Sequence, residues 1–390
     1  MDILLNEEEQ MVRDSARSFL ESETNTKMAR AMEKDELGYP PALWKQIADL
    51  GWTGMCLPDQ YGGQGLGLTY LGLVMEEIGR AIAPLPLLST AVPAMTIAEY
   101  GSDAIKQAVL PAVSSGDMLL TFAYQERDAR MVADAIKTSA TVDGDNFVVN
   151  GTKMFVDNCN VANKILTVVR TKAGSTGRDG LSLLLIDANT AGITQTMEVT
   201  TAKDKQGRLD LKDVKVPKAN LVGTQDQGWE AIEKMLDMAT ALEVMYMEGA
   251  ARKDVEITIA YAKERTAFGR PIGAFQSVAH MLADAIMWCD GAQLLGMEAV
   301  YMIERHGKGG LEVSQAKAFA NDRLVPACRF GQAIHGGIGF MMEFDINLYY
   351  RRVASGSMRL GTAFEHRARI AAALIDQPGK VRLGVTVPTL

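Results

Sequence analysis

The sequence lacks the patterns that mark several common protein classes. Its four cysteines are scattered with no C-x-x-C pair, which argues against a zinc site and suits a reducing compartment. Lysine and arginine are not clustered and the formal net charge is −8, so we expect no nucleic-acid partner. No apolar run reaches the roughly 20 residues of a membrane-spanning helix. The acidic start, MDILLNEEEQ, fits neither a signal nor a transit peptide, and we expect a cytoplasmic protein without membrane insertion.

The first part of the chain has the periodicity of helices. Asn6 and Glu9 form a capping-box pattern ahead of apolar pairs with helical spacing. Pro40 and Pro41 begin a second helix, because proline is tolerated in the first turn. Further helical patterns cover 68–82, 87–100 and 102–113. We therefore expect an N-terminal helical domain over residues 1–118.

The pattern then changes to short β-rich segments without helices between them. These segments are 119–126, 138–142, 146–156, 164–171, 181–188, 193–201 and 208–216. The tetrapeptide Asp143-Gly144-Asp145-Asn146 is typical of a tight hairpin turn. Short strands with short loops favour a small antiparallel barrel over residues 119–226.

The last part returns to the helical period. It predicts one helix of about forty residues over 228–267, then helices over 275–306, 312–334 and 355–375. Long helices with short connections indicate a four-helix bundle over residues 227–390. The expected fold class is therefore α+β.

The corner between the first two of these long helices carries one cation, one aromatic ring and one amide. Phe268-Gly269 ends the first helix, and Phe275-Gln276 opens the next. Arg265 offers a charge-assisted fork for phosphate, and Gln276 can both donate and accept hydrogen bonds. The corner suits a large anionic ligand, although an ordinary helical hairpin could contain the same residues.

Four strings in a fixed order resemble the acyl-CoA dehydrogenase family over essentially the whole chain. They are LPDQYGGQG, GDNFVVNGTKMFVDN, YAKERTAFGRPIGAFQ and IHGGIGF. The resemblance implies oxidation of the α,β C–C bond of an acyl-CoA thioester with FAD as cofactor. It also implies electron-transfer flavoprotein as acceptor. A tetramer is implied too, in which neighbouring subunits share each FAD.

The resemblance assigns one group of positions to the nucleotide end of FAD. Arg265 matches the arginine that holds the pyrophosphate, Phe268 the aromatic beside it, and Gln276 a glutamine that usually reaches a neighbour's cofactor. Gly336 and Gly337 match glycines that let the backbone approach the nucleotide, as absent side chains permit.

A second group is assigned to the flavin end. Thr362 matches a threonine near the FAD phosphates, and Phe155 takes the position of a tryptophan that packs on the flavin. Tyr124 opens a strand, 124–126, that hydrogen-bonds the flavin in the family. Asp157 occupies the third place of the family's W-I-T string, and Gln332 lies one place before the family's glutamine.

The residue that usually removes the α-proton is missing. The family's Y-E-G-T glutamate corresponds to Leu360, and a leucine cannot accept a proton. A minority of members place the glutamate and an arginine on the long bundle helix, where this chain has Ala239 and Thr240. Both usual bases are therefore absent.

Two explanations remain open. In the first, the base has moved to Glu243, which lies one helical turn after Ala239, or to Asp157 or Glu126. In the second, the chain is a FAD-binding but non-catalytic subunit of an α2β2 heterotetramer with a homologous chain, in place of a homotetramer. A flavin-free structural relative is a third reading. The sequence does not identify the acyl group, and it predicts no metal site.

Overall fold

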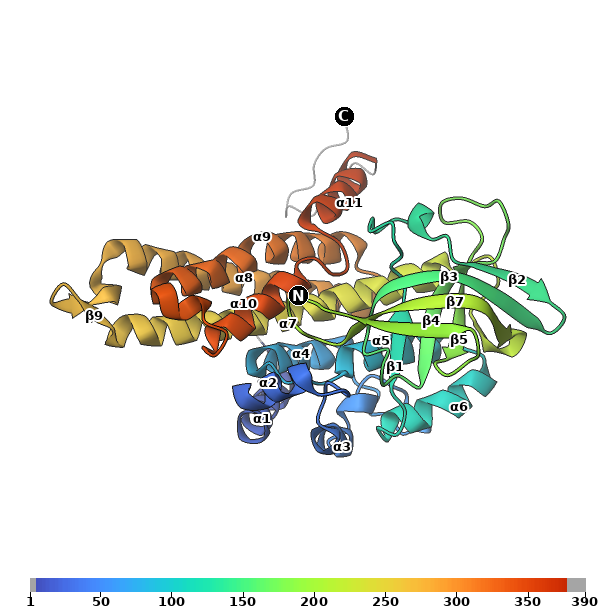
Figure 1. The fold of residues 1–390 in the computed structure, drawn as a ribbon, viewed down its shortest axis with the longest axis horizontal. Coiled ribbons are helices and arrows are strands. Elements are labelled where there is room, and N and C mark those ends of the chain that lie inside the picture. The colour runs from blue at the N-terminus through green and yellow to red at the C-terminus, as the bar shows by residue number, and fades with distance from the viewer. Residues whose placement is uncertain (1–4, 377–390) are drawn as a thin grey trace.

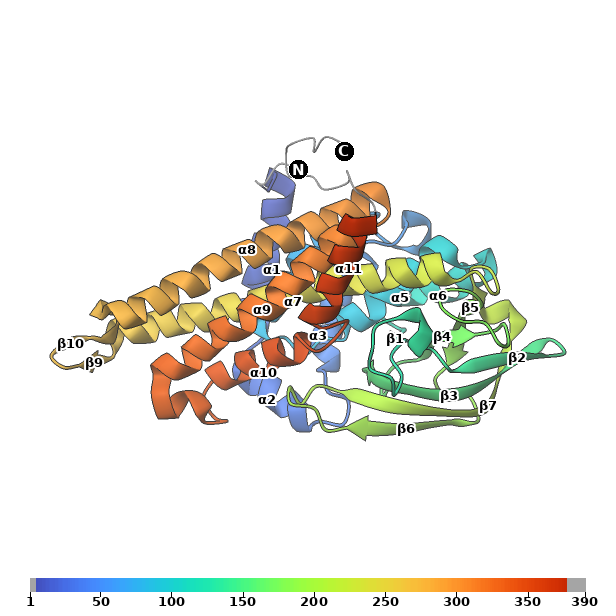
Figure 2. The same ribbon diagram turned by 90° about the horizontal axis from the view of Figure 1, so that it is seen from above.

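The computed structural model describes residues 5–376, and the chain in this range has an α+β architecture. Helices from both ends of the chain pack side by side, and the β strands lie together at one end of the molecule (Figure 1). Turning the molecule shows that the longest helices run away from the β strands and end in a small hairpin of β9 (Thr266–Ala267) and β10 (Arg270–Pro271) (Figure 2).

Six helices form the N-terminal region. They are α1 (Glu7–Glu23), α2 (Thr26–Lys34), α3 (Pro41–Asp49), α4 (Leu68–Ala81), α5 (Leu87–Tyr100) and α6 (Asp103–Ser114). The predicted capping box is confirmed, since Asn6 and Glu9 each accept a hydrogen bond from the other's backbone N–H. The nine-residue α2, capped by Asn25, was not predicted.

Eight strands follow in one sheet. They are β1 (Leu120–Ala123), β2 (Ser139–Asp143), β3 (Asn146–Asp157), β4 (Lys164–Arg170), β5 (Leu181–Asp187), β6 (Ile193–Glu198), β7 (Gln206–Pro217) and β8 (Leu221–Val222). The predicted hairpin is confirmed, because Asp143 pairs with Asn146 and Gly144 turns the chain with φ +56°. The sheet is mainly antiparallel, but β1 runs parallel to β4, since the two are not joined by a hairpin.

The C-terminal region contains α7 (Trp229–Glu264), α8 (Gln276–His306), α9 (Gly310–His335), α10 (Ile346–Gly356) and α11 (Ala363–Asp376). The three long helices agree with prediction. The single helix expected over 355–375 is wrong: α10 and α11 are separate. Leu360 and Gly361 have φ values of +54° and +98°, which no right-handed helix contains, so the chain turns between them.

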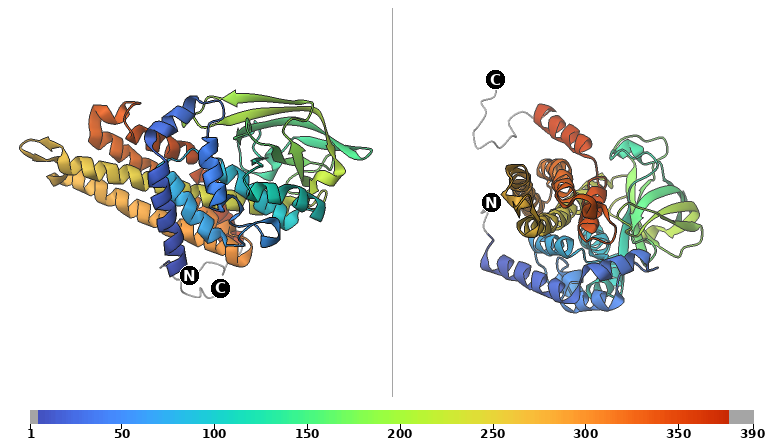
Figure 3. Two further views of the ribbon diagram at one scale, coloured as in Figure 1. Left: turned by 90° about the horizontal axis from the view of Figure 1, so that it is seen from below. Right: turned by 60° about the vertical axis from the view of Figure 1, so that its left-hand side comes forward.

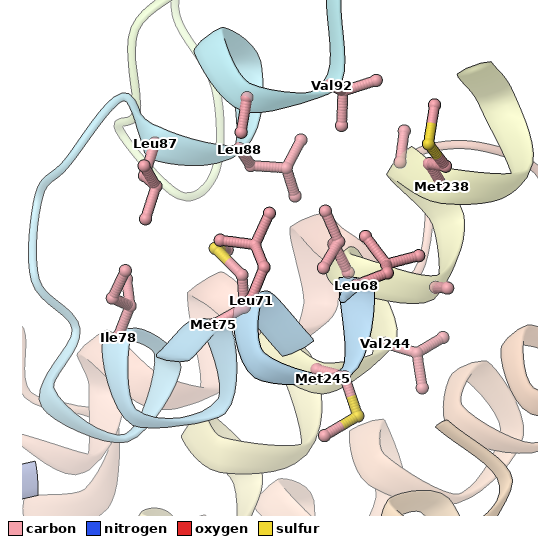
Figure 4. Close-up of a cluster of buried hydrophobic side chains, with 14 of the residues drawn as sticks. Leu68, Leu71, Met75, Ile78, Leu87, Leu88, Val92, Met238, Val244 and Met245 are labelled. Carbon is pink, nitrogen blue, oxygen red and sulfur yellow. The ribbon is translucent and has the colours of Figure 1, made fainter. Parts of the chain in front are cut away.

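A large apolar core joins the N-terminal helices to α7. Leu71 and Met75 of α4 point towards Leu88 of α5, while Met245 of the adjoining α7 points the other way, and all four are buried (Figure 4). The views in Figure 3 show the N-terminal helices against one side of the long helices, beside the β strands. This packing fixes α7 next to the sheet, which is where the candidate site lies.

Two further properties bear on function. Within residues 5–376, no helix combines the length and the apolar character needed to cross a membrane. The same part of the chain contains no group of three potential metal ligands.

Candidate active site

Two cavities meet where α7, α10 and the β sheet come together. The larger, of about 700 Å³, lies between the sheet and the 357–362 turn that joins α10 to α11. The smaller, of about 110 Å³, lies between α4, α5, α7 and the 202–205 loop. Both cavities are lined by Asp157, Ser355 and Arg359, so these residues form the wall between them.

The larger cavity gathers the predicted flavin-end residues. Tyr124, Phe155, Asp157 and Thr362 all line it. So does Leu360. Phe155 and Leu360 have φ values of +52° and +54°, a conformation that costs energy for bulky residues and is concentrated at functional sites.

These residues fit a flavin. Phe155 is 48% exposed and lines the cavity, so an aromatic ring is available there. The Tyr124 hydroxyl is buried and has no hydrogen-bond partner within residues 5–376, although such groups are normally satisfied. Burial raises the pKa of Tyr124 to about 12, so it stays a hydrogen-bond donor. A flavin is planar and has polar edges, so it can stack on the ring of Phe155 and accept a hydrogen bond from the hydroxyl of Tyr124.

The smaller cavity contains Glu243. This side chain is only 3% exposed and lines the cavity, whereas Ala239 and Thr240 are fully buried and do not line it. Of these three positions on α7, Glu243 is therefore the one that a ligand in the cavity can reach. Lys317, also fully buried, donates a hydrogen bond to the Gly356 carbonyl next to Glu243. Burial lowers the pKa of Lys317 to about 8, while the charge of Glu243 opposes that shift.

Arg359 carries a positive charge in the wall between the two cavities. Its guanidinium group is paired with the Asp157 carboxylate and lies 3.5 Å from Asp204. Burial raises the pKa of Asp157 to about 7, and the guanidinium of Arg359 limits the rise. Asp157 is therefore paired and shared between the cavities, while Glu243 forms no ion pair with any residue in the described range.

Glu126 is occupied elsewhere. Its carboxylate pairs at 2.7 Å with Lys153, which is fully buried, and accepts backbone N–H bonds from Lys137 and Thr138. Burial raises the pKa of Glu126, but Lys153 and these bonds outweigh it and lower the pKa overall. The side chain lines neither cavity, so its geometry favours a structural role.

The predicted nucleotide-end residues lie far from the cavities. Arg265, Phe268 and Gln276 sit around the β9 (Thr266–Ala267) and β10 (Arg270–Pro271) hairpin, at the far end of α7 from the sheet (Figure 1). Counting along α7, Arg265 is about 33 Å from Glu243 at 1.5 Å per residue. The Phe268 ring is 95% exposed. One chain therefore does not bring the two groups together.

The remaining predicted residues lie near the end of α9. His335 stacks on Tyr261 with ring centroids 4.2 Å apart, which places Gly336 and Gly337 towards the hairpin end of α7. Both glycines are exposed, with open space where a side chain would stand. Gln332 is 5% exposed and lines neither cavity.

Sequence reasoning missed the charged residues around Glu243. Arg359, Lys317 and Arg352 come from three different segments, and nothing in their local sequence indicates that they meet. One signal was available: Lys317 stands in the small-residue run AKAFA on a buried helix face, where a lysine is unusual.

Comparisons with known proteins agree with this architecture. Residues 6–117, 121–214 and 226–375 match the N-terminal, middle and C-terminal domains described for acyl-CoA dehydrogenase. The chain is 30% identical to a probable acyl-CoA dehydrogenase of Bacillus subtilis, YngJ, over 386 residues, which cover 96% of this chain and 100% of YngJ.

Two solved structures are similar over nearly their full length. A G363A variant of the Tcur3481-Tcur3483 steroid ACAD has a TM-score of 0.86 at 31% identity, covering 95% of this chain and 98% of that one. The ChsE4-ChsE5 complex from Mycobacterium tuberculosis has a TM-score of 0.88 at 25% identity, covering 97% and 100%. This chain belongs to the acyl-CoA dehydrogenase family of FAD-dependent oxidoreductases.

Proposed function

We propose that this chain oxidises the α,β C–C bond of an acyl-CoA thioester and that Glu243 is the base. The observation that carries the proposal is the position of the Glu243 carboxylate. It lies in the small cavity that shares a wall with the cavity fitted to a flavin. In this arrangement the acyl group occupies the small cavity, and its α,β bond lies at the shared wall.

The chain's own residues supply the proton step. The carboxylate of Glu243 accepts the α-proton, and its 3% exposure keeps water away from the developing carbanion. Lys317 and Arg359 place positive charge beside this carboxylate. FAD held by the flavin-end residues would supply the acceptor for the β-hydrogen, which would leave as hydride. Electron-transfer flavoprotein then serves as the electron acceptor.

The cofactor is held by residues from two subunits in this proposal. Tyr124, Phe155, Asp157 and Thr362 of one subunit contact the flavin end. The Arg265, Phe268 and Gln276 corner of a neighbour, with Gly336 and Gly337, contacts the nucleotide end. Gln332 supports the backbone of that turn from beneath. The distance between the corner and the cavity of one chain supports sharing.

The Glu243→Gln variant tests the base. The neutral amide keeps the shape but cannot accept the α-proton, so we expect turnover of acyl-CoA substrates to fall about 10²–10⁴-fold. FAD content and thermal stability should stay at the level of the unmodified protein. Glu230→Gln, an exposed residue on the same helix, is the matched control. Unchanged turnover in Glu243→Gln excludes Glu243 as base.

A second function is favoured by two observations. Leu360 replaces the usual glutamate, and two similar structures are named as assemblies of two different chains. The alternative is a FAD-binding, non-catalytic subunit of an α2β2 complex. Affinity purification from the native host decides between them: a homologous second chain in equal amount supports the alternative, and a fully active homotetramer excludes it.

A further inference from the structure

Arg352 brings a guanidinium group to the small cavity without an acceptor. It lies on α10 and lines the cavity together with Glu243 and Tyr246 of α7. Its Nε atom is buried and has no hydrogen-bond partner in the described part of the chain. No described carboxylate lies within ion-pair distance of it. The Arg352 side chain as a whole is part-buried, but its buried Nε–H is costly without an acceptor, because it loses water and gains no hydrogen bond in return.

The preceding arginine shows what a structural role looks like at this place. Arg351 donates to Asn347 at 2.8 Å, to Glu33 at 2.7 Å and to the backbone oxygen of Thr201 at 3.2 Å. It ties α10 to α2 and to the loop after β6. Arg352, one residue on, has no such partners, so its charge is not explained by the fold.

Asp204 and Asp157 near this cavity already have partners, and Glu243, which lines the same cavity, forms no ion pair with Arg352. Asp204 accepts hydrogen bonds from the Thr200 hydroxyl at 2.5 Å and from Gln206 at 3.1 Å, and it lies 3.5 Å from Arg359. Asp157 is paired with Arg359. The guanidinium of Arg352 is therefore left for a ligand that enters the cavity.

The opposite wall of the cavity is apolar. Met75 and Ile78 of α4, Leu85 just before α5 and Leu88 in α5 line it. A ligand that fits both walls has a hydrocarbon stretch and one anionic group, because guanidinium recognises carboxylate with paired, charge-assisted bonds.

The size of the cavity, about 110 Å³, limits how long that hydrocarbon stretch is. Glu243 and Tyr246 are three residues apart on one face of α7, which places them about 5–6 Å apart. Burial raises the pKa of Tyr246, and of the charges that act on it Arg352 lowers the pKa while Glu243 raises it. The charges of Arg352 and Glu243 thus both act on this phenol, and the three side chains line the same small cavity.

We propose that the acyl group of the substrate is short and ends in a carboxylate, which Arg352 binds. This inference rests on the proposed function, since it places the acyl group in the small cavity. Arg352 is then the residue that selects dicarboxylic monothioesters over simple fatty acyl thioesters. The cavity volume of about 110 Å³ agrees with a short acyl group.

A phosphate of CoA is the other anion that could reach Arg352. Lys203 and Lys205 also line the cavity, and Lys203 is exposed. Phosphate binding by Arg352 would affect every CoA compound equally, whereas carboxylate binding affects only those with an acidic acyl end.

Equilibrium binding to the purified FAD-loaded protein tests the inference without requiring turnover. Dissociation constants are measured for glutaryl-CoA, pentanoyl-CoA and free CoA, where the first two match in carbon number and differ in the terminal carboxylate. We expect glutaryl-CoA to bind about tenfold or more tightly than pentanoyl-CoA. In Arg352→Met the dissociation constant for pentanoyl-CoA divided by that for glutaryl-CoA should fall to about one. In Arg352→Lys this ratio should remain above one.

Several outcomes overturn the inference. Equal binding of the two thioesters by the unmodified protein does so, as does an Arg352→Met variant that weakens both thioesters and free CoA by the same factor. Lys203→Met is the matched control and should leave the ratio intact. A ratio that falls equally in both variants also overturns it. Flavin absorbance and melting temperature establish that each variant is folded.

Repeating the titrations in Glu243→Gln separates this inference from the proposed function. The preference for glutaryl-CoA should persist in that variant even where turnover is lost. If the preference persists and turnover is unaffected by Glu243→Gln, the base assignment fails and the carboxylate site stands.

Discussion

The Arg359 guanidinium is paired with the Asp157 carboxylate in the wall between the two cavities. Because Asp204 lies 3.5 Å from the same guanidinium, removing Arg359 leaves two carboxylates without their cation. We expect Arg359→Met to lower the free energy of unfolding by about 3 kcal/mol, as for other pairs that lose one partner. Chemical denaturation measures this change.

The double variant Arg359→Met/Asp157→Asn supplies the control for that prediction. It removes both charges of the pair, so it should be more stable than Arg359→Met alone, by about 1 kcal/mol or more. Additive effects of the two changes would contradict a direct interaction between these side chains.

Leu360 gives a way to restore the usual base. Its side chain lines the flavin cavity, and its backbone already has the left-handed conformation of this turn. Adding Leu360→Glu to the Glu243→Gln variant should recover part of the lost turnover, by about tenfold or more. Leu360→Gln in the same background is the control. Equal activity of the two double variants would show that a carboxylate here cannot reach the substrate.

The separation of the corner from the cavity predicts complementation between subunits. A chain with Arg265→Ala and a chain with Phe155→Ala should each lose most bound FAD when purified alone. When they are co-expressed and mixed at random in a symmetric assembly, about a quarter of the sites combine an intact corner with an intact cavity. The FAD-to-protein ratio, read from absorbance, measures this fraction. No recovery of FAD would mean that each site is built from one chain.

Asp254 makes stability depend on pH. Its side chain is fully buried on α7, neither carboxylate oxygen has a partner among residues 5–376, and burial raises its pKa well above 3.8. The folded protein therefore retains a proton that the unfolded chain releases above about pH 4. Stability should fall as pH rises from that value, with a slope of up to about 1.4 kcal/mol per pH unit.

The Asp254→Asn variant removes this proton linkage while it keeps the shape of the side chain. Its melting temperature should exceed that of the unmodified protein at pH 8, and the difference should shrink towards pH 4. A difference that is the same at both values would show that Asp254 is ionised in the folded protein.

Local patterns predicted most of the helices and strands, because capping, proline placement and hairpin chemistry act over a few residues. Asn6 and Glu9, the Asp143–Asn146 turn and the Phe268-Gly269 corner all behave as the sequence indicates. The break at Leu360 was missed, since a leucine with positive φ has no local signature.

The candidate site could be predicted only in part, because most of its contacts join segments that are distant in the sequence. Glu243 was found because α7 is one continuous helix, along which positions can be counted. The cluster around it depends on contacts between α7, α9, α10 and the 199–206 loop, which no local pattern encodes. The flavin-end residues came from family resemblance, and their assignment as FAD contacts stays a prediction.

Helix α7 carries Glu243 near its middle and ends at Arg265, so in the proposed assembly it serves two catalytic centres at once. An insertion or deletion of one residue between these positions would shift the corner by 1.5 Å and rotate it by about 100°. The neighbour would lose its cofactor clamp while the chain's own base stayed in place. The length of this segment is thus under constraint from both subunits, and only changes by whole helical turns preserve the direction in which the corner points.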